Sequence, residues 1–128
     1  KTDNLPGSPA ATGDAMTLAA STDTYWATVD ITIDDATSTD EYTITWFKNG
    51  IRQTSGITSP LIQVVKRSDG TDLISSTAMT QIGTTGSYKY DAITTARLTA
   101  GEAAIAVVSA TIDASGRSFS KLVSRDSA

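Results

Sequence analysis

Apolar and polar residues alternate one by one over several segments of this chain, and no other feature limits the possible folds as strongly. Between residues 25 and 33, five apolar side chains alternate with Trp26, Thr28, Asp30 and Thr32. Successive side chains of a strand point to opposite sides of a sheet, so this period of two indicates a strand with one buried face. The same period recurs at residues 42–47, 87–91 and 119–123, and strands are also expected at 103–112 and at 61–67, where Ile62, Val64 and Val65 suggest burial on both faces. An all-β protein is expected.

Tight-turn sequences separate these segments and predict how they pair. Asn49-Gly50 supplies the two positive-φ positions of a type I′ turn and predicts a hairpin that returns over residues 51–53. Further hairpin turns are expected at residues 68–70 and 113–116, and a loop at 54–60, where Gly56 and Pro60 disfavour a strand. Seven to nine strands, with turns about every ten residues, predict an antiparallel two-sheet sandwich. We expect close to half strand and under about a tenth helix.

Two segments depart from simple alternation. Residues 94–106 are rich in Ala, but β-branched neighbours and Gly101 limit any helix to a turn or two near residues 96–102. Residues 103–112 are the most apolar stretch and carry Ile105 and Val107 on the face opposite the Ala-rich one. Such a segment predicts a central strand that is covered on both sides.

Residues 1–20 are expected to form an extended N-terminal arm in front of a sandwich domain at 21–128. The arm contains Pro and Gly among small residues and shows no apolar periodicity, so it is expected to be disordered by itself. Ordering it would need a surface, either its own domain or the next subunit of an assembly. The candidate anchors for such a contact are Leu5, Met16 and Leu18.

Composition excludes several kinds of chemistry. The chain has no Cys and no His, which removes disulfides, thiolate nucleophiles, His-based triads and the usual ligands of transition metals. Its net charge is −4 and its ten cations are scattered, whereas phosphate backbones demand clustered Lys and Arg. No apolar run approaches the ~20 residues of a membrane helix. We expect no enzyme activity, no cofactor, no nucleic-acid partner and no membrane insertion.

Two local features carry alternative interpretations. Carboxylates gather between Asp34 and Glu41, and clustered carboxylates can bind calcium, although the spacing matches no calcium loop and a solvated loop is favoured. Trp26 lies on the polar face of its strand and is the best single candidate for an interface or ligand contact. Packing of Trp26 under the N-terminal arm is the competing interpretation. Trp46 shares a face with Tyr42 and Ile44 and is expected in the core.

Four motifs stand out in the middle of the chain: Trp46-Phe47-Lys48-Asn49-Gly50, Ser68-Asp69-Gly70-Thr71, Ala78-Met79-Thr80-Gln81-Ile82-Gly83 and Gly86-Ser87-Tyr88-Lys89-Tyr90-Asp91. Within about residues 41–120 they resemble immunoglobulin-like or macroglobulin-like sandwich domains. In that group a strand ends in a tight turn, a short Asp-Gly hairpin follows, and a Gly-x-Tyr-x-Tyr strand crosses to the other sheet. Such modules recur in phage and archaeal-virus structural proteins and in prokaryotic surface proteins. The resemblance implies no catalytic residues.

Two functions of different classes follow from these observations. With 22 Thr and 15 Ser but only two Glu, the composition is typical of secreted or virion-surface β proteins. The first hypothesis is a structural subunit of a repeating extracellular assembly, foremost a virion head or tail component. Its neighbours would be copies of itself or other structural subunits, held by the arm and by sheet edges. The alternative is a carbohydrate-binding or host-adhesion domain, whose partner would be a glycan.

Overall fold

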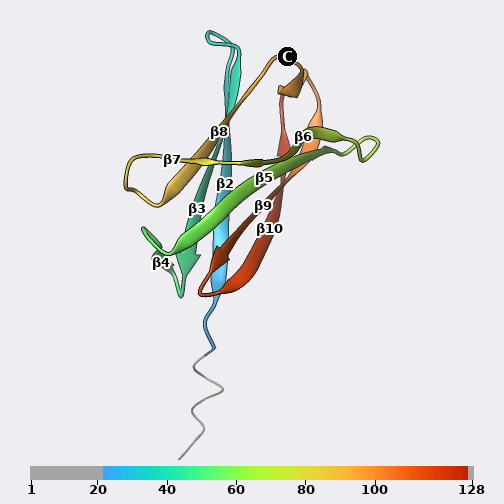
Figure 1. Ribbon diagram of the computed structural model, residues 1–128. Coiled ribbons are helices and arrows are strands. Elements are labelled where there is room, and N and C mark those ends of the chain that lie inside the picture. Colours follow the sequence, from blue (N-terminus) through green and yellow to red (C-terminus); the bar gives the residue numbers. More distant parts are fainter. Residues whose placement is uncertain (1–21, 127–128) are drawn as a thin grey trace, which may run out of the picture.

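The computed structural model describes residues 22–126, which form two antiparallel β-sheets packed face to face (Figure 1). One sheet has the order β2-β3-β8-β7, with β4 beside the end of β3; its strands are β2 (Tyr25–Asp34), β3 (Thr39–Lys48), β4 (Ile51–Arg52), β7 (Thr80–Gln81) and β8 (Ser87–Ile93). The other has the order β10-β9-β5-β6; its strands are β5 (Ile57–Lys66), β6 (Asp72–Ala78), β9 (Ala103–Ile112) and β10 (Ser115–Ser124).

The expected two-sheet β-sandwich is confirmed, with nine strands within the described residues. Strands make up 65% of the structure, more than the half that the sequence predicts, because five of them run for ten residues. The helical turn expected near residues 96–102 is instead one short 3₁₀ turn, η2 (Thr94–Ala96). Within residues 22–126, no helix is long and apolar enough to cross a membrane.

The core lies between the sheets and is built from the alternating positions of their long strands. β3 contributes its large side chains Tyr42, Ile44 and Trp46, each at most 1% exposed, which confirms Trp46 as a core residue. β9 contributes every second residue, and most of these are small: Ala104, Ala106, Val108, Ala110 and Ile112. Bulky aromatic side chains on one sheet therefore share the core with an Ala-rich strand on the other, which keeps the packing dense.

Two of the hairpin turns show how local sequence sets the connections. Asn49 and Gly50 have φ values of 53° and 80°, as the predicted type I′ turn requires. The turn between β9 and β10 is tighter than expected, because Asp113 and Ala114 adopt φ values of 53° and 66° and β10 already begins at Ser115. Gly116, expected in the turn, therefore lies in the strand.

The expected loop at residues 54–60 is wrong in its second half. β5 begins at Ile57, four residues earlier than predicted, and passes through Pro60. The pairing of β5 with β9 shifts between Thr58 and Leu61, and Ser59 in that interval has a φ of 53°. This β-bulge frees Pro60 from the ladder, where its missing N–H would otherwise break a hydrogen bond. Its carbonyl accepts a hydrogen bond from the Met79 N–H at 3.0 Å.

The two ends of the sandwich differ in what they hold. β2 begins beside the β3–β4 and β9–β10 turns: the Asn49 N–H donates to the Thr24 carbonyl, and the Tyr25 hydroxyl donates to the Asp113 carboxylate. The end of β10 lies at the opposite end of the molecule, together with the β2–β3 turn (Figure 1). The N-terminal side of β2 and the C-terminal side of β10 thus leave the sandwich at opposite ends.

Candidate functional site

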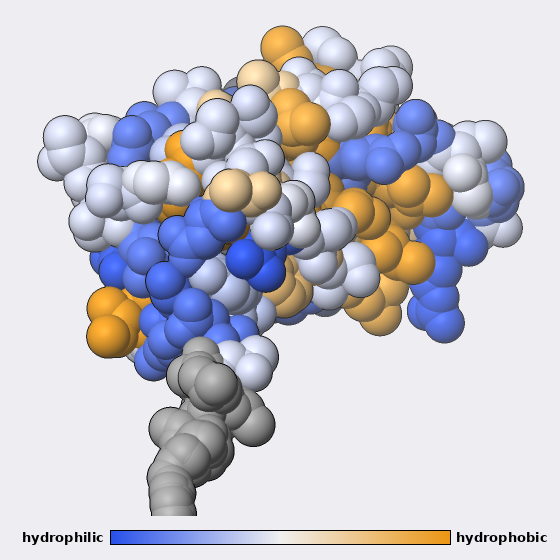
Figure 2. Space-filling view, turned by 60° about the horizontal axis from the view of Figure 1, so that its bottom comes forward, coloured by the Kyte–Doolittle hydropathy of each residue, from blue (hydrophilic) through white to orange (hydrophobic). Residues whose placement is uncertain are grey.

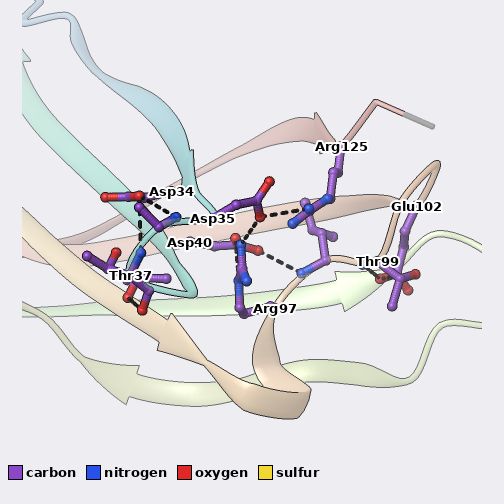
Figure 3. A network of polar contacts seen from close by, with 11 residues as sticks. Asp34, Asp35, Thr37, Asp40, Arg97, Thr99, Glu102 and Arg125 are labelled. Carbon is purple, nitrogen blue, oxygen red and sulfur yellow. Dashed lines mark hydrogen bonds and ion pairs between the residues drawn. The ribbon is translucent and has the colours of Figure 1, made fainter. Parts of the chain in front are cut away.

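The expected acidic loop is shorter than predicted: residues 34–38 are exposed as expected, but Asp40 is not part of the loop. The turn between β2 and β3 covers only residues 35–38, and Asp40 lies within β3 and is fully buried. Its carboxylate accepts hydrogen bonds from Arg97 Nε at 3.0 Å and from the Leu98 N–H at 2.7 Å (Figure 3). The interpretation of Asp40 as part of a solvated loop is therefore wrong, because its carboxylate caps the connection between η2 and β9 from inside the fold.

Asp35 extends this contact to the end of β10. Its Oδ1 accepts hydrogen bonds from Arg97 Nη2 and Arg125 Nη2, both at 2.8 Å (Figure 3). The two guanidinium groups hold the pKa of Asp35 below its usual range. Within residues 22–126, no group of three or more acidic side chains is arranged to hold a metal ion. The guanidinium groups of Arg97 and Arg125 are the charged partners of Asp35, and that of Arg97 is the charged partner of Asp40.

The outer face of the five-stranded sheet is largely polar, with apolar side chains at its two ends: Trp26 and Phe47 at one, and the exposed Ile93 at the other. Trp26 lies on this face, 40% exposed, and stacks on Phe47 of the neighbouring strand with ring centroids 4.3 Å apart and an angle of 9° between the planes. Beside Phe47, Arg52 donates a hydrogen bond from Nη2 to Ser87 Oγ at 2.8 Å. Thr45 and Ser87 share a further hydrogen bond of 2.8 Å. The structure thus places Trp26 in an exposed aromatic pair that borders a row of hydroxyl groups.

A shallow depression of about 330 Å³ lies on the same sheet, at the end opposite Trp26, and its lining residues are Thr32, Asp34, Thr37, Thr39, Glu41 and Asp91. Lys89 lies between two of the carboxylates, 3.5 Å from Glu41 and 3.4 Å from Asp91. Asp34 accepts hydrogen bonds from the N–H groups of Ala36 and Thr37 and so shapes the turn. The side chains of Asp34, Thr39, Glu41 and Asp91 have protein partners, and the depression is open to solvent.

The outer face of the four-stranded sheet carries exposed apolar side chains, among them Ile105, which was expected to be covered. Ile105 on β9 and Leu122 on β10 are directly opposite each other and are 38% and 54% exposed. Val65 pairs with Ile105 and continues this row, while Val107 and Leu61 lie further along the same face, with Gln63 between Leu61 and Val65. We name the apolar residues of this face the apolar strip: Leu61, Val65, Ile105, Val107 and Leu122. Figure 2 shows apolar side chains gathered on the side where Figure 1 places β5, β6, β9 and β10.

The prediction that β9 is covered on both sides is therefore wrong for its outer face. β9 is central within its sheet, as expected, with β10 and β5 as neighbours. No described segment lies over its outer side chains, however, since both sheets pack together through their inner faces. Beside Leu61 the face is hollowed by about 280 Å³, where Ser109, Gly116 and Ser118 present little or no side chain.

One lateral edge of the sandwich, where β2 and β10 are the outermost strands, is closed by charged side chains. Lys121 of β10 donates a hydrogen bond from Nζ to the Val29 carbonyl of β2 at 2.8 Å. The Arg117 guanidinium lies 3.6 Å from the centre of the Tyr25 ring. Asp113 accepts from Lys48 at 2.8 Å and from the Tyr25 hydroxyl, and these contacts lower the pKa of Asp113. The two edge strands are thus tied to each other.

Of the predicted contact residues, only Trp26 falls within the described part of the chain. Leu5, Met16 and Leu18 lie outside the described residues. Ile105 and Leu122 were not predicted as contact residues. An apolar residue in each of two successive strands, as found at these positions, could have indicated them. No protein-family model, curated protein or solved structure matches this chain.

Proposed function

We propose that this chain is a non-enzymatic structural subunit of a repeating assembly, which contacts its neighbours through the outer face of the four-stranded sheet. The observation that carries the proposal is the apolar strip, with its exposed pair Ile105 and Leu122. An apolar area rimmed by polar residues is characteristic of protein–protein contact surfaces. Here the rim is formed by Ser118, Ser120 and Ser109 on the same face.

The size of this contact favours a repeating assembly over a tight pair. Burying a whole Ile or Leu side chain contributes about 1.5–3 kcal/mol, and these two side chains are already partly buried. A single contact of this kind is weak after the entropy lost on association. Contacts repeated in a lattice or tube reinforce one another, because each further contact forms at high effective concentration.

The wider setting of the assembly is part of the same proposal. The resemblance of residues 41–120 to immunoglobulin-like modules suggests a virion head or tail component, located at a virion surface or outside the cell. The Thr- and Ser-rich composition is in keeping with that setting, and the chain has neither the Cys nor the His on which many catalytic sites depend. The carboxylates at Asp35 and Asp40 are paired with arginines, which supports a structural role for them.

Sedimentation velocity over a wide range of protein concentration tests this proposal. The mass of the unaltered chain is expected to rise with concentration, and Leu122→Ser combined with Ile105→Thr is expected to shift that rise to higher concentration. Ile51→Thr is the matched control, because Ile51 is 68% exposed but lies at the β3–β4 turn, away from the apolar strip. A chain that stays monomeric throughout, or an equal effect of the control, would refute the proposal.

Glycan binding is the second candidate, favoured by the exposed Trp26–Phe47 stack. Aromatic rings bind the apolar faces of sugars, and the neighbouring hydroxyls of Thr28 and Thr45 lie on the same face as the stack, where a sugar could hydrogen-bond to them. Trp46 is 1% exposed, so a change in tryptophan fluorescence on adding oligosaccharides would report on Trp26. No change across neutral and acidic oligosaccharides, or an unaltered response in Trp26→Ala, would exclude this function for the aromatic pair.

A further inference from the structure

The most exposed part of the apolar strip lies far from the point where the N-terminal segment joins the sandwich. At the β2 end, the Thr24 N–H donates to Asn49 Oδ1 in the β3–β4 turn, and Tyr25 contacts the β9–β10 turn through Asp113. Leu122 lies seven positions beyond Ser115, the first residue of β10 after that turn. At about 3.4 Å per residue, this separation along the strand is roughly 24 Å.

This distance exceeds the reach of the two apolar side chains closest to the sandwich. Leu18 and Met16 precede Thr22 by four and six residues. A fully extended chain spans at most about 3.6 Å per residue, so the two residues reach no more than about 14 Å and 22 Å from Thr22. The path to the outer face must also cross the roughly 10 Å between the two sheets. Leu18 therefore cannot reach Leu122 and Ile105 of its own sandwich, and the backbone at Met16 also falls short of them.

We infer that Met16 and Leu18 of one copy pack against Ile105 and Leu122 of the next copy, so that the N-terminal segment 1–20 links neighbouring subunits. This inference rests on the proposed assembly function and names the segment that occupies the apolar strip. The ends of the sandwich favour such a link, because the segment joins β2 at one end and the exposed pair lies near the other. Copies arranged end to end bring one copy's segment to its neighbour's exposed pair.

The surface around the strip suits an extended segment. Along β10 the outward-facing residues between the exposed pair and the turn are Gly116, Ser118 and Ser120, so a chain can approach the sheet closely. Residues 1–20 are themselves mostly small, with Leu5 as the one further large apolar side chain. The hollow of about 280 Å³ beside Leu61 is on the same face and offers a place for Leu5.

Disulfide trapping tests the inference directly, because the chain has no Cys of its own. One full-length chain would carry Leu18→Cys and a second, distinguished by a mass tag, Leu122→Cys; the two are mixed and oxidised mildly. We expect a covalent heterodimer between the two chains. The control partner carries Ser76→Cys, an exposed polar position on β6 of the same sheet, and is expected to give several-fold less heterodimer.

The outcomes separate this inference from the proposed function. If the chain assembles in sedimentation but Leu122→Cys is trapped no better than Ser76→Cys, another surface occupies the strip and the inference is wrong. If Leu18→Cys instead closes onto Trp26→Cys within one chain, the segment covers its own domain and the inference is again wrong. A chain that never assembles refutes both. As a second measurement, deleting residues 1–18 is expected to weaken assembly while the far-ultraviolet spectrum stays that of a folded β protein.

Discussion

Replacing Asp40 by Ala tests whether the buried carboxylate stabilises the fold. Asp40 is fully buried in β3 and accepts hydrogen bonds from Arg97 and from the Leu98 N–H. Removing the carboxylate leaves a buried N–H without an acceptor and deprives Arg97 of its interior partner. Breaking a buried ion pair by removing one partner typically costs about 3–5 kcal/mol, and that range is expected here.

The assay is equilibrium unfolding in urea. For a domain of this size the slope of free energy against urea is about 2 kcal/mol per molar, so a loss of about 4 kcal/mol lowers the midpoint by roughly 2 M. Asp35→Ala is the control, since Asp35 bonds the same arginine but its side chain is 67% exposed, and little change is expected. The double variant Asp40→Ala with Arg97→Ala should be less destabilised than the sum of the two single variants, because the unpaired charge is also removed. An unchanged midpoint in Asp40→Ala would refute this reasoning.

Three further outcomes follow from single contacts. Gly86→Ala places a Cβ 2.1 Å from the Gln53 carbonyl oxygen, at a φ of +79°. The free energy of unfolding in urea is therefore expected to fall by about 2–5 kcal/mol. Gly50→Ala is the control, because Gly50 has a similar φ but open space around it, and a loss of about 1 kcal/mol is expected there. Asp35 and Asp113 have lowered pKa values in the folded protein, so the unfolded chain binds more protons below pH ~4; urea midpoints should fall with pH there, less so in Asp35→Asn. Burial and the charge of Asp40 raise the pKa of Tyr42, so stability should fall as pH rises above ~10, and this decrease should be smaller in Tyr42→Phe.

The fold class could be predicted because its determinants are local. The alternation in residues 25–33 and the Asn49-Gly50 dipeptide each fix a strand or a turn whatever the rest of the chain does. The loop predicted at residues 54–60 was wrong because it rested on the local effect of Pro60 alone. Its effect on a strand depends on whether its position needs an N–H in the ladder, and a bulge that forms only when β5 meets β9 removes that need.

The functional surfaces depended on contacts between distant parts of the sequence. Asp40 appeared to belong to the acidic stretch around it, yet its partner Arg97 is 57 residues away, and burial became apparent only when β3 and η2 came together. Ile105 shows the opposite error. Its apolar neighbours predicted cover on both sides, but whether an outer face is covered depends on which other segment packs there, and no local pattern carries that information.

The edges and faces of this sandwich differ in how they could serve an assembly. An open edge strand invites another strand to pair with it, and proteins commonly prevent this with charged side chains that point inward or with bulges. Here Lys121 occupies the Val29 carbonyl at the edge of β2, and Arg117 lies over Tyr25. On the other side, the pairing of β6 with β5 is interrupted by register shifts between Ile62 and Val65.

These features make unplanned strand addition costly at both lateral edges of the sandwich. Within residues 22–126, nothing comparable protects the outer face of the four-stranded sheet, and its Ile105 and Leu122 side chains gain from being covered. An assembly that joined copies edge to edge would have to displace the Lys121 contact first. An assembly that joined copies through the apolar strip would leave both sheets and every described hydrogen bond intact. For that reason we propose the subunit contact on the outer face of the four-stranded sheet.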